Sequence, residues 1–83
     1  MQSPASQEII KRFFDAIYAL IDRNIIRGKQ TFTRRYDINY WNFHTLEKEM
    51  HRDLFQMAWL THLVEDYGVS AQWLLTGKGE MFK

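Results

Sequence analysis

The sequence predicts a compact all-α domain of five helices. Apolar residues recur at intervals of three and four along most of the chain, which is the spacing of one helix face. One proline and four glycines are the only strong breakers in 83 residues, and no segment alternates as a half-buried strand does. The length and the hydrophobic content of 46% predict one domain, residues 1–83, with a core of its own.

The first helix is predicted from about residue 5 to residue 24. Ser3 or Ser6 can cap its N-terminus, and Pro4 suits the first turn. The apolar stripe that predicts its buried face consists of Ile10, Phe13, Phe14, Ile17, Leu20 and Ile21.

Two short helices are predicted next, one from Lys29 to Tyr36 and one from Tyr40 to Lys48. Asp37 between them tolerates a left-handed backbone better than most residues do, and Asn39 is a good N-cap. A tight turn between two helices is therefore expected. The charged residues 48–53 predict a loop after the second of these helices.

The apolar spacing predicts a fourth helix from Leu54 to Tyr67. Gly68 is placed to end this helix in a left-handed conformation. Ser70 is expected to cap a short fifth helix in which Trp73 and Leu74 face inward.

Composition excludes several classes of protein. No cysteine is present, which excludes a disulfide framework, a thiolate zinc site and a cysteine nucleophile, and which fits a reducing cytoplasm. No apolar run approaches the roughly 18 residues of a membrane span, and the N-terminus is no signal peptide. A Gly-rich phosphate loop and an arranged nucleophile are both missing, so we expect no enzyme, no cofactor and no small-molecule substrate. His44, Glu47 and His51 lack a fourth ligand, so no metal is expected there.

Charge is distributed unevenly along the chain. The net charge is only +1, yet residues 23–52 hold seven Lys and Arg against three Asp and Glu. A basic centre between acidic ends is typical of a face that meets a polyanion, and it also occurs on solvated helix faces.

The spacing of apolar residues around the predicted turn is that of a helix-turn-helix. The apolar positions, at offsets 0, 4, 6, 11 and 14, are Phe32, Tyr36, Ile38, Phe43 and Leu46. Asp37 stands at the turn position, where glycine is usual, and Thr33 stands where alanine is usual. Residues 29–48 therefore predict a helix-turn-helix.

The whole arrangement resembles the phage-repressor (Xre-like, lambda repressor-like) helix-turn-helix family of DNA-binding domains. The most specific segment is YGVSAQWLLTGKGEMF, residues 67–82, and the likeness extends over about residues 8–82. It departs from the family at residues 48–53, where a glycine-containing loop is usual. The resemblance implies a five-helix domain that binds an operator in double-stranded DNA. Members often continue into a dimerisation or sensor domain, so a longer regulator with this chain as its N-terminal domain is also consistent.

By this resemblance the third helix would read base edges in the major groove, and the second helix would approach phosphate. The candidates for base contact are Asn39, Tyr40, Trp41, His44, Thr45 and Lys48. The candidates for phosphate contact are Lys29, Gln30, Arg34, Arg35 and Arg52. Glu47 is expected to pair locally with an arginine.

The expected function is sequence-specific regulation of transcription, as a repressor, in a bacterial or phage-encoded cytoplasmic protein without a membrane partner. A homodimer on DNA is expected, with Leu75, Met81 and Phe82 as candidate contacts. The alternative is a helix-turn-helix fold that serves as a protein-binding or dimerisation adaptor, which apolar residues left on the surface, such as Trp41, would favour.

Overall fold

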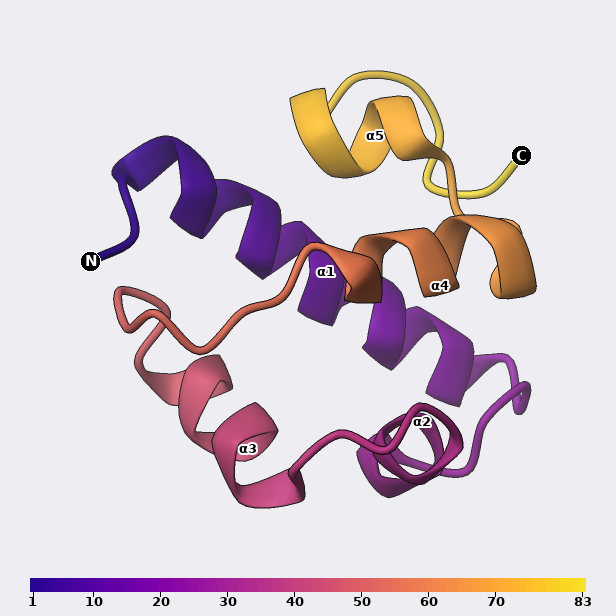
Figure 1. Cartoon of the computed structure of the whole chain (residues 1–83). Helices are drawn as coiled ribbons and strands as arrows, with labels where there is room; N and C mark the ends of the chain where they lie inside the picture. The colour runs from indigo at the N-terminus through magenta and orange to yellow at the C-terminus, as the bar shows by residue number, and fades with distance from the viewer.

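The computed structural model describes all 83 residues and confirms the predicted all-α class (Figure 1). The helices are α1 (Pro4–Asp22), α2 (Lys29–Arg35), α3 (Tyr40–Lys48), α4 (Ala58–Tyr67) and α5 (Ala71–Thr76). The only β-type pairing is an isolated antiparallel bridge between Val69 and Phe82. None of the helices is both long and apolar enough to cross a membrane.

Helix α1 forms the centre of the molecule, with α2 and α3 on one side of it and α5 on the other in the view of Figure 1. Ser3 accepts a hydrogen bond from the backbone N–H of Ser6 at 3.1 Å, and Pro4 begins the helix. The helix ends at Asp22, about two residues before the predicted end, and Asn24 then takes a left-handed φ of 60°. The buried side chains of α1 are Ile10, Phe13, Phe14, Ala16, Ile17 and Leu20.

The turn between α2 and α3 has the local chemistry that the sequence predicts. Asp37 takes a left-handed φ of 55°, and the N–H of Ile38 donates to the carbonyl of Thr33 at 2.8 Å. Asn39 caps α3 by accepting a hydrogen bond from the N–H of Asn42 at 3.0 Å. The direction in which α3 leaves α2 is therefore fixed by hydrogen bonds within the segment itself.

The predicted start of the fourth helix at Leu54 is wrong, because α4 begins at Ala58. Leu54 and Phe55 both pack against the core, and the Phe55 ring stands edge-on to the ring of Trp59 with centroids 5.2 Å apart. Met57, which the helical spacing placed inward, is exposed. Long-range packing of the Phe55 ring thus overrides the local periodicity and keeps residues 54–57 irregular.

Helices α4 and α5 meet at a short glycine-led connection. Gly68 ends α4 with a left-handed φ of 71°, as predicted, and Ser70 caps α5 by accepting from the N–H of Trp73 at 3.2 Å. Leu74 is buried, whereas Trp73 is only half-buried against the core. The expected inward direction therefore holds fully for Leu74 and partly for Trp73.

The C-terminal segment folds back onto the α4–α5 connection. The N–H of Ser70 donates to the carbonyl of Met81 at 2.7 Å, and the N–H of Lys83 donates to the carbonyl of Gly68 at 3.0 Å. The Arg23 guanidinium lies 3.9 Å from the centroid of the Phe82 ring. Met81 and Phe82, two of the residues expected to contact a second chain, are half-buried against the core of their own chain.

A side chain of α1 caps the C-terminus of α5. Arg12 donates to the carbonyl oxygens of Leu74, at 2.8 Å, and of Leu75, at 3.1 Å. These carbonyls have no partner within their own helix, so the guanidinium supplies bonds that the last turn needs.

Replacing Arg12 with methionine should therefore destabilise the domain by about 1–2 kcal/mol, the size of a charge-assisted hydrogen bond at a partly open site. Urea unfolding would measure this change. Lys11→Met is the matched control, because Lys11 is the exposed neighbour on the same helix and makes no such bond. Equal midpoints for the two variants would contradict the capping role.

Candidate functional site

Helices α2 and α3 share an open, hollowed face, which we call the α2–α3 surface. One hollow of about 510 Å³ is lined by Gln30, Thr33, Arg34, Asp37, Ile38, Tyr40 and Trp41. A neighbouring hollow of about 370 Å³ is lined by Arg27, Gly28, Lys29, Gln30, Thr31, Arg34 and Tyr40. Gln30, Arg34 and Tyr40 line both, so the two hollows form one continuous surface.

The predicted base-contact residues are spread along α3 and its N-cap, and three of them bring their rings together. Tyr40, Trp41 and His44 gather their rings at the start of α3: the Tyr40 and His44 rings are stacked with centroids 5.9 Å apart, and the Trp41 ring stands edge-on to that of Tyr40 at 5.7 Å. Thr45 is half-buried and Lys48 is exposed further along the helix. Asn39, the N-cap residue of α3, is exposed as well.

Trp41 is the least covered large ring of the domain. Its side chain is 72% exposed, although an indole buries much apolar area wherever a partner is available. Trp41 is expected either to contact bases or to form part of a protein-binding surface, and both roles need an outward ring. The structure shows that it faces outward.

The predicted phosphate contacts do not all share one surface. Gln30 and Arg34 are exposed on the α2–α3 surface, and Arg34 makes no ion pair. Arg35 points toward α4, where its guanidinium lies 3.8 Å from the Asp66 carboxylate. Arg52 lies in the loop after α3, beside an acidic residue of the same segment.

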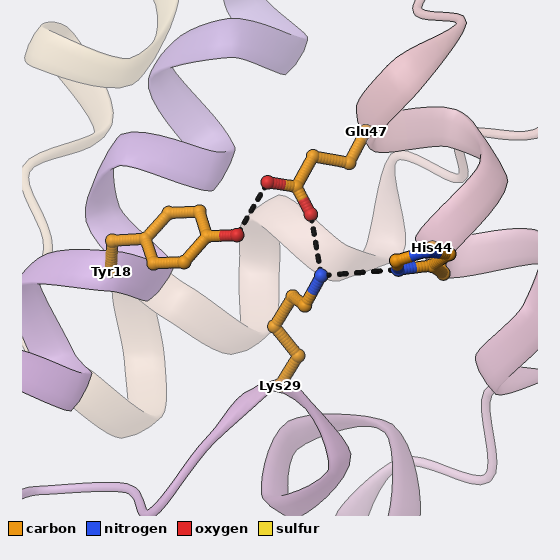
Figure 2. Close-up of polar contacts among 4 residues, drawn as sticks. All are labelled: Tyr18, Lys29, His44 and Glu47. Atoms are coloured by element: carbon orange, nitrogen blue, oxygen red, sulfur yellow. Dashed lines mark hydrogen bonds and ion pairs between the residues drawn. The ribbon is translucent and has the colours of Figure 1, made fainter.

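Lys29 points into a polar cluster that joins three helices (Figure 2). Its Nζ donates to Oε1 of Glu47 at 2.6 Å and lies 3.3 Å from Nδ1 of His44. The Tyr18 hydroxyl donates to the other carboxylate oxygen of Glu47. The side chains of Lys29 and Glu47 are only 16% and 23% exposed, so the pair is shielded from solvent. This Tyr18–Lys29–His44–Glu47 cluster fastens α3 to α1 and α2.

The ionisation of the cluster is set by competition between burial and hydrogen bonding. Burial lowers the pKa of Lys29, but the hydrogen bond to Glu47 and its charge outweigh burial, so the pKa of Lys29 lies above its ordinary value. Burial raises the pKa of Glu47, but the bonds from Lys29 and Tyr18 outweigh it, so the pKa of Glu47 lies below its ordinary value. The hydrogen bond to Glu47 raises the pKa of Tyr18. Lys29 and Glu47 are therefore both charged at neutral pH.

The expected pairing of Glu47 with an arginine is corrected to Lys29 and Tyr18. Tyr18 is on α1, 29 residues before Glu47, and no local pattern connects the two positions. Arg27 was also missed as a residue of the α2–α3 surface, although its charge is part of the basic centre that the sequence displays. A pair of residues far apart in the sequence produces no pattern that predicts their contact. A run of basic residues, in contrast, can be recognised in the sequence directly.

A second cluster joins the C-terminal end of α2 to α4. The Tyr36 ring stacks on the imidazole of His62 with centroids 3.8 Å apart, and its hydroxyl donates to Asp66. Burial and the hydrogen bond to Asp66 raise the pKa of Tyr36 well above its ordinary value. Arg35 closes the cluster by donating to the Tyr67 hydroxyl at 3.3 Å.

No protein-family model, curated protein or solved structure matches the chain. Any assignment of function therefore depends on the surfaces described above.

The Lys29–Glu47 pair predicts that the domain loses stability in acid. Because the pKa of Glu47 is lower in the folded than in the unfolded chain, its contribution is complete above the unfolded value of about 4.3. The contribution is lost as the pH falls through the lower, folded value. Glu47→Gln should cost about 1–3 kcal/mol at pH 7 and should flatten the acid limb of the stability curve.

Urea unfolding between pH 7 and pH 3 would measure both effects. The matched control is Glu49→Gln, since Glu49 is exposed and lies 3.7 Å from Arg52. An exposed pair of this kind is expected to contribute less than about 1 kcal/mol. Identical pH profiles for wild type and Glu47→Gln would disprove the role of the pair.

Proposed function

We propose that this chain binds double-stranded DNA in a sequence-specific manner, with α3 as the recognition helix, and regulates transcription as a repressor. The observation that carries the proposal is the α2–α3 surface, where free cationic side chains adjoin exposed aromatic rings. Arg27 and Arg34 line this surface and make no ion pair. Phosphate attracts such cations, and base edges or methyl groups accept aromatic and polar contacts.

The turn between α2 and α3 supports a helix-turn-helix assignment. The left-handed Asp37 and the cap supplied by Asn39 start α3 immediately after the turn. Phe43 and Leu46 of α3 are buried, whereas Trp41 and Lys48 on the opposite side of the helix are exposed and Tyr40 and His44 on its flank are half-buried. A recognition helix needs this division between an anchored face and a reading face.

The roles within the proposed interface follow from exposure and charge. Arg34 and Gln30, with Arg27 beside them, would contact phosphate and fix the register. Tyr40, Trp41 and His44 would face the bases, and Lys48 would lie nearer the sugar-phosphate backbone of the DNA. Lys29 and Arg35 hold carboxylate partners within the domain, so we assign them mainly to holding α2 in place.

A homodimer on DNA is part of the proposal, because one recognition helix contacts only a few base pairs. Leu75 remains the candidate contact, since it is 51% exposed and borders an apolar groove between α4 and α5. Sedimentation with a selected operator would show two protein chains per duplex. A saturated complex of one chain per duplex would contradict this part of the proposal.

The alternative is a protein-binding adaptor, and one observation favours it. Trp41 adjoins Ile38 and Tyr40 in the larger hollow, which gives this region an apolar character uncommon on a groove-reading face. An adaptor would bind its partner with little dependence on salt. A DNA-binding domain must release counterions as it binds.

We predict that affinity for random duplex DNA falls linearly with the logarithm of salt concentration. Arg34→Ala should weaken binding to all sequences alike and reduce the slope by about one, the contribution of one phosphate contact. Fluorescence anisotropy from low to moderate salt would measure the slope. Lys78→Ala is the control, because Lys78 comes two residues after the end of α5, and α5 lies on the other side of α1 from α2 and α3 in the view of Figure 1. Affinity that does not change with salt would favour the adaptor.

The decisive test of the proposed function is selection of bound sequences from random duplex DNA. An enriched site with two-fold symmetry would support a dimeric, sequence-specific binder. A pool that shows no enrichment after repeated rounds would contradict sequence-specific binding.

A further inference from the structure

The contact between Lys29 and His44 fixes which ring nitrogen of His44 carries the proton. A lysine ammonium has three hydrogen-bond donors and no acceptor. Nζ of Lys29 lies 3.3 Å from Nδ1 of His44 (Figure 2), so Nδ1 must act as the acceptor. A neutral imidazole whose Nδ1 accepts carries its hydrogen on Nε2.

The surrounding contacts make this arrangement stable. Glu47 accepts a hydrogen bond from the same Nζ at 2.6 Å, and Tyr18 holds the other oxygen of the carboxylate. Lys29 is therefore charged and restrained, with donors left over for the imidazole. The Tyr40 ring lies beside the imidazole, inclined by only 16° to it, with centroids 5.9 Å apart.

The other ring nitrogen is available to a ligand. Nε2 of His44 makes no hydrogen bond within the chain, and no buried side-chain nitrogen or oxygen of the domain lacks a partner. Nε2 is therefore open to solvent on the reading face of α3. Its N–H is a donor of fixed direction.

We propose that Lys29 is a positioning residue that holds His44 as an outward N–H donor, and that His44 consequently selects guanine. This inference deepens the proposed DNA-binding function and depends on it. Guanine presents two adjacent acceptors, N7 and O6, in the major groove, whereas cytosine presents a donor there. Adenine presents one acceptor, N7, beside an amino donor, and thymine presents one acceptor, O4, beside a methyl group. A donor at Nε2 therefore matches guanine best, since both of its groove atoms accept, and matches cytosine worst.

The first test is the tautomer of His44 in the free protein, measured by two-bond ¹H–¹⁵N NMR correlation at pH 8. The expected result is protonation at Nε2 alone in wild type, with an Nδ1–H fraction appearing in Lys29→Met. Lys48→Met is the matched control, since Lys48 is an exposed lysine on the helix of His44 and makes no hydrogen bond with it. Protonation at Nδ1 in wild type would overturn the inference, whatever the stability of the variants.

The second test compares the DNA sequences that wild type and His44→Ala select. The expected result is that one position loses its preference for guanine by about ten-fold, within the range for one base contact. The matched variant Thr45→Ala should keep guanine at that position. Retention of guanine by His44→Ala would overturn the base assignment, even with the expected tautomer. A wild type that selects no sequence would overturn the DNA-binding proposal itself, and the guanine assignment with it.

Discussion

Replacing Phe13 with alanine should cost about 3–5 kcal/mol of folding free energy, the largest stability effect we expect from any single substitution. Phe13 is fully buried at the centre of the core. Its ring lies within 6.0 Å, between centroids, of those of Phe14, Phe32, Phe43, Phe55 and Trp59. Alanine would leave a cavity at the point where α1, α2, α3 and α4 meet. Four of these five ring pairs are edge-on, a geometry that adds to the area buried.

Total stabilities of domains are about 5–15 kcal/mol, so Phe13→Ala should leave a small margin at 25 °C. Thermal and urea unfolding followed by circular dichroism would measure the loss. Trp41→Ala is the matched control, because it removes a larger ring that is mostly exposed and should change stability by less than about 0.5 kcal/mol. A small loss for Phe13→Ala, or a large one for Trp41→Ala, would contradict the packing described here.

The parts of the fold that the sequence predicts well depend on contacts between near neighbours. Asn39 and Ser70 cap their helices by reaching the N–H three residues ahead. The left-handed turns at Asp37 and Gly68 follow from the intrinsic preferences of those two residues. Such features need no knowledge of the remaining chain, so they can be read from a few adjacent residues.

The features that were missed depend on partners far along the chain. The start of α4 is delayed because Phe55 packs against α1, and a helical periodicity cannot report that contact. The partial burial of Met81 and Phe82, which the sequence places among the candidate dimer contacts, has a related cause. The bridge between Phe82 and Val69 turns the last residues back onto their own domain.

The candidate site shows the same division. The exposed basic and aromatic residues of α2 and α3 could be predicted as a group, because helical spacing determines which residues share a face. Which of the basic side chains form an ion pair within the domain, and which stay free, could not be predicted. Lys29, Arg34 and Arg35 are equivalent in the sequence pattern, yet only Arg34 remains free of a carboxylate partner. Tertiary placement of Glu47 and Asp66 decides this outcome.

The ion pairs also divide the side chains of α2 into two groups, those that hold the helix in the domain and those that are free to bind a ligand. Lys29 and Arg35, near its two ends, are bound to α3 and α4, and therefore hold the helix within the domain. Arg34 and Gln30 lie on the α2–α3 surface and form no ion pair with another helix. Substitutions at the two ends should therefore affect stability and binding together, whereas substitutions at Arg34 and Gln30 should affect binding alone.

Tyr40→Ala and Thr45→Ala should each reduce affinity for the selected site by about 1–3 kcal/mol while changing affinity for random DNA much less. The reason is geometric. Phe43 and Leu46 hold α3 to the core, so the helix surface that they leave uncovered is the one that can enter a major groove. That surface includes Tyr40 in the first turn of α3 and Thr45 in the second.

The measurement is the ratio of specific to random affinity at one fixed salt concentration, for each variant and for wild type. Arg34→Ala is the matched control, because loss of a phosphate contact should weaken both affinities and leave the ratio nearly unchanged. Tyr40 and Thr45 are only partly buried, so their truncation should preserve folding, which circular dichroism would verify. If both variants keep the wild-type ratio, α3 does not read bases.

In that case the exposed Trp41 becomes the centre of a protein-binding surface. Trp41→Ala should then abolish binding of the protein partner without changing any residual affinity for DNA.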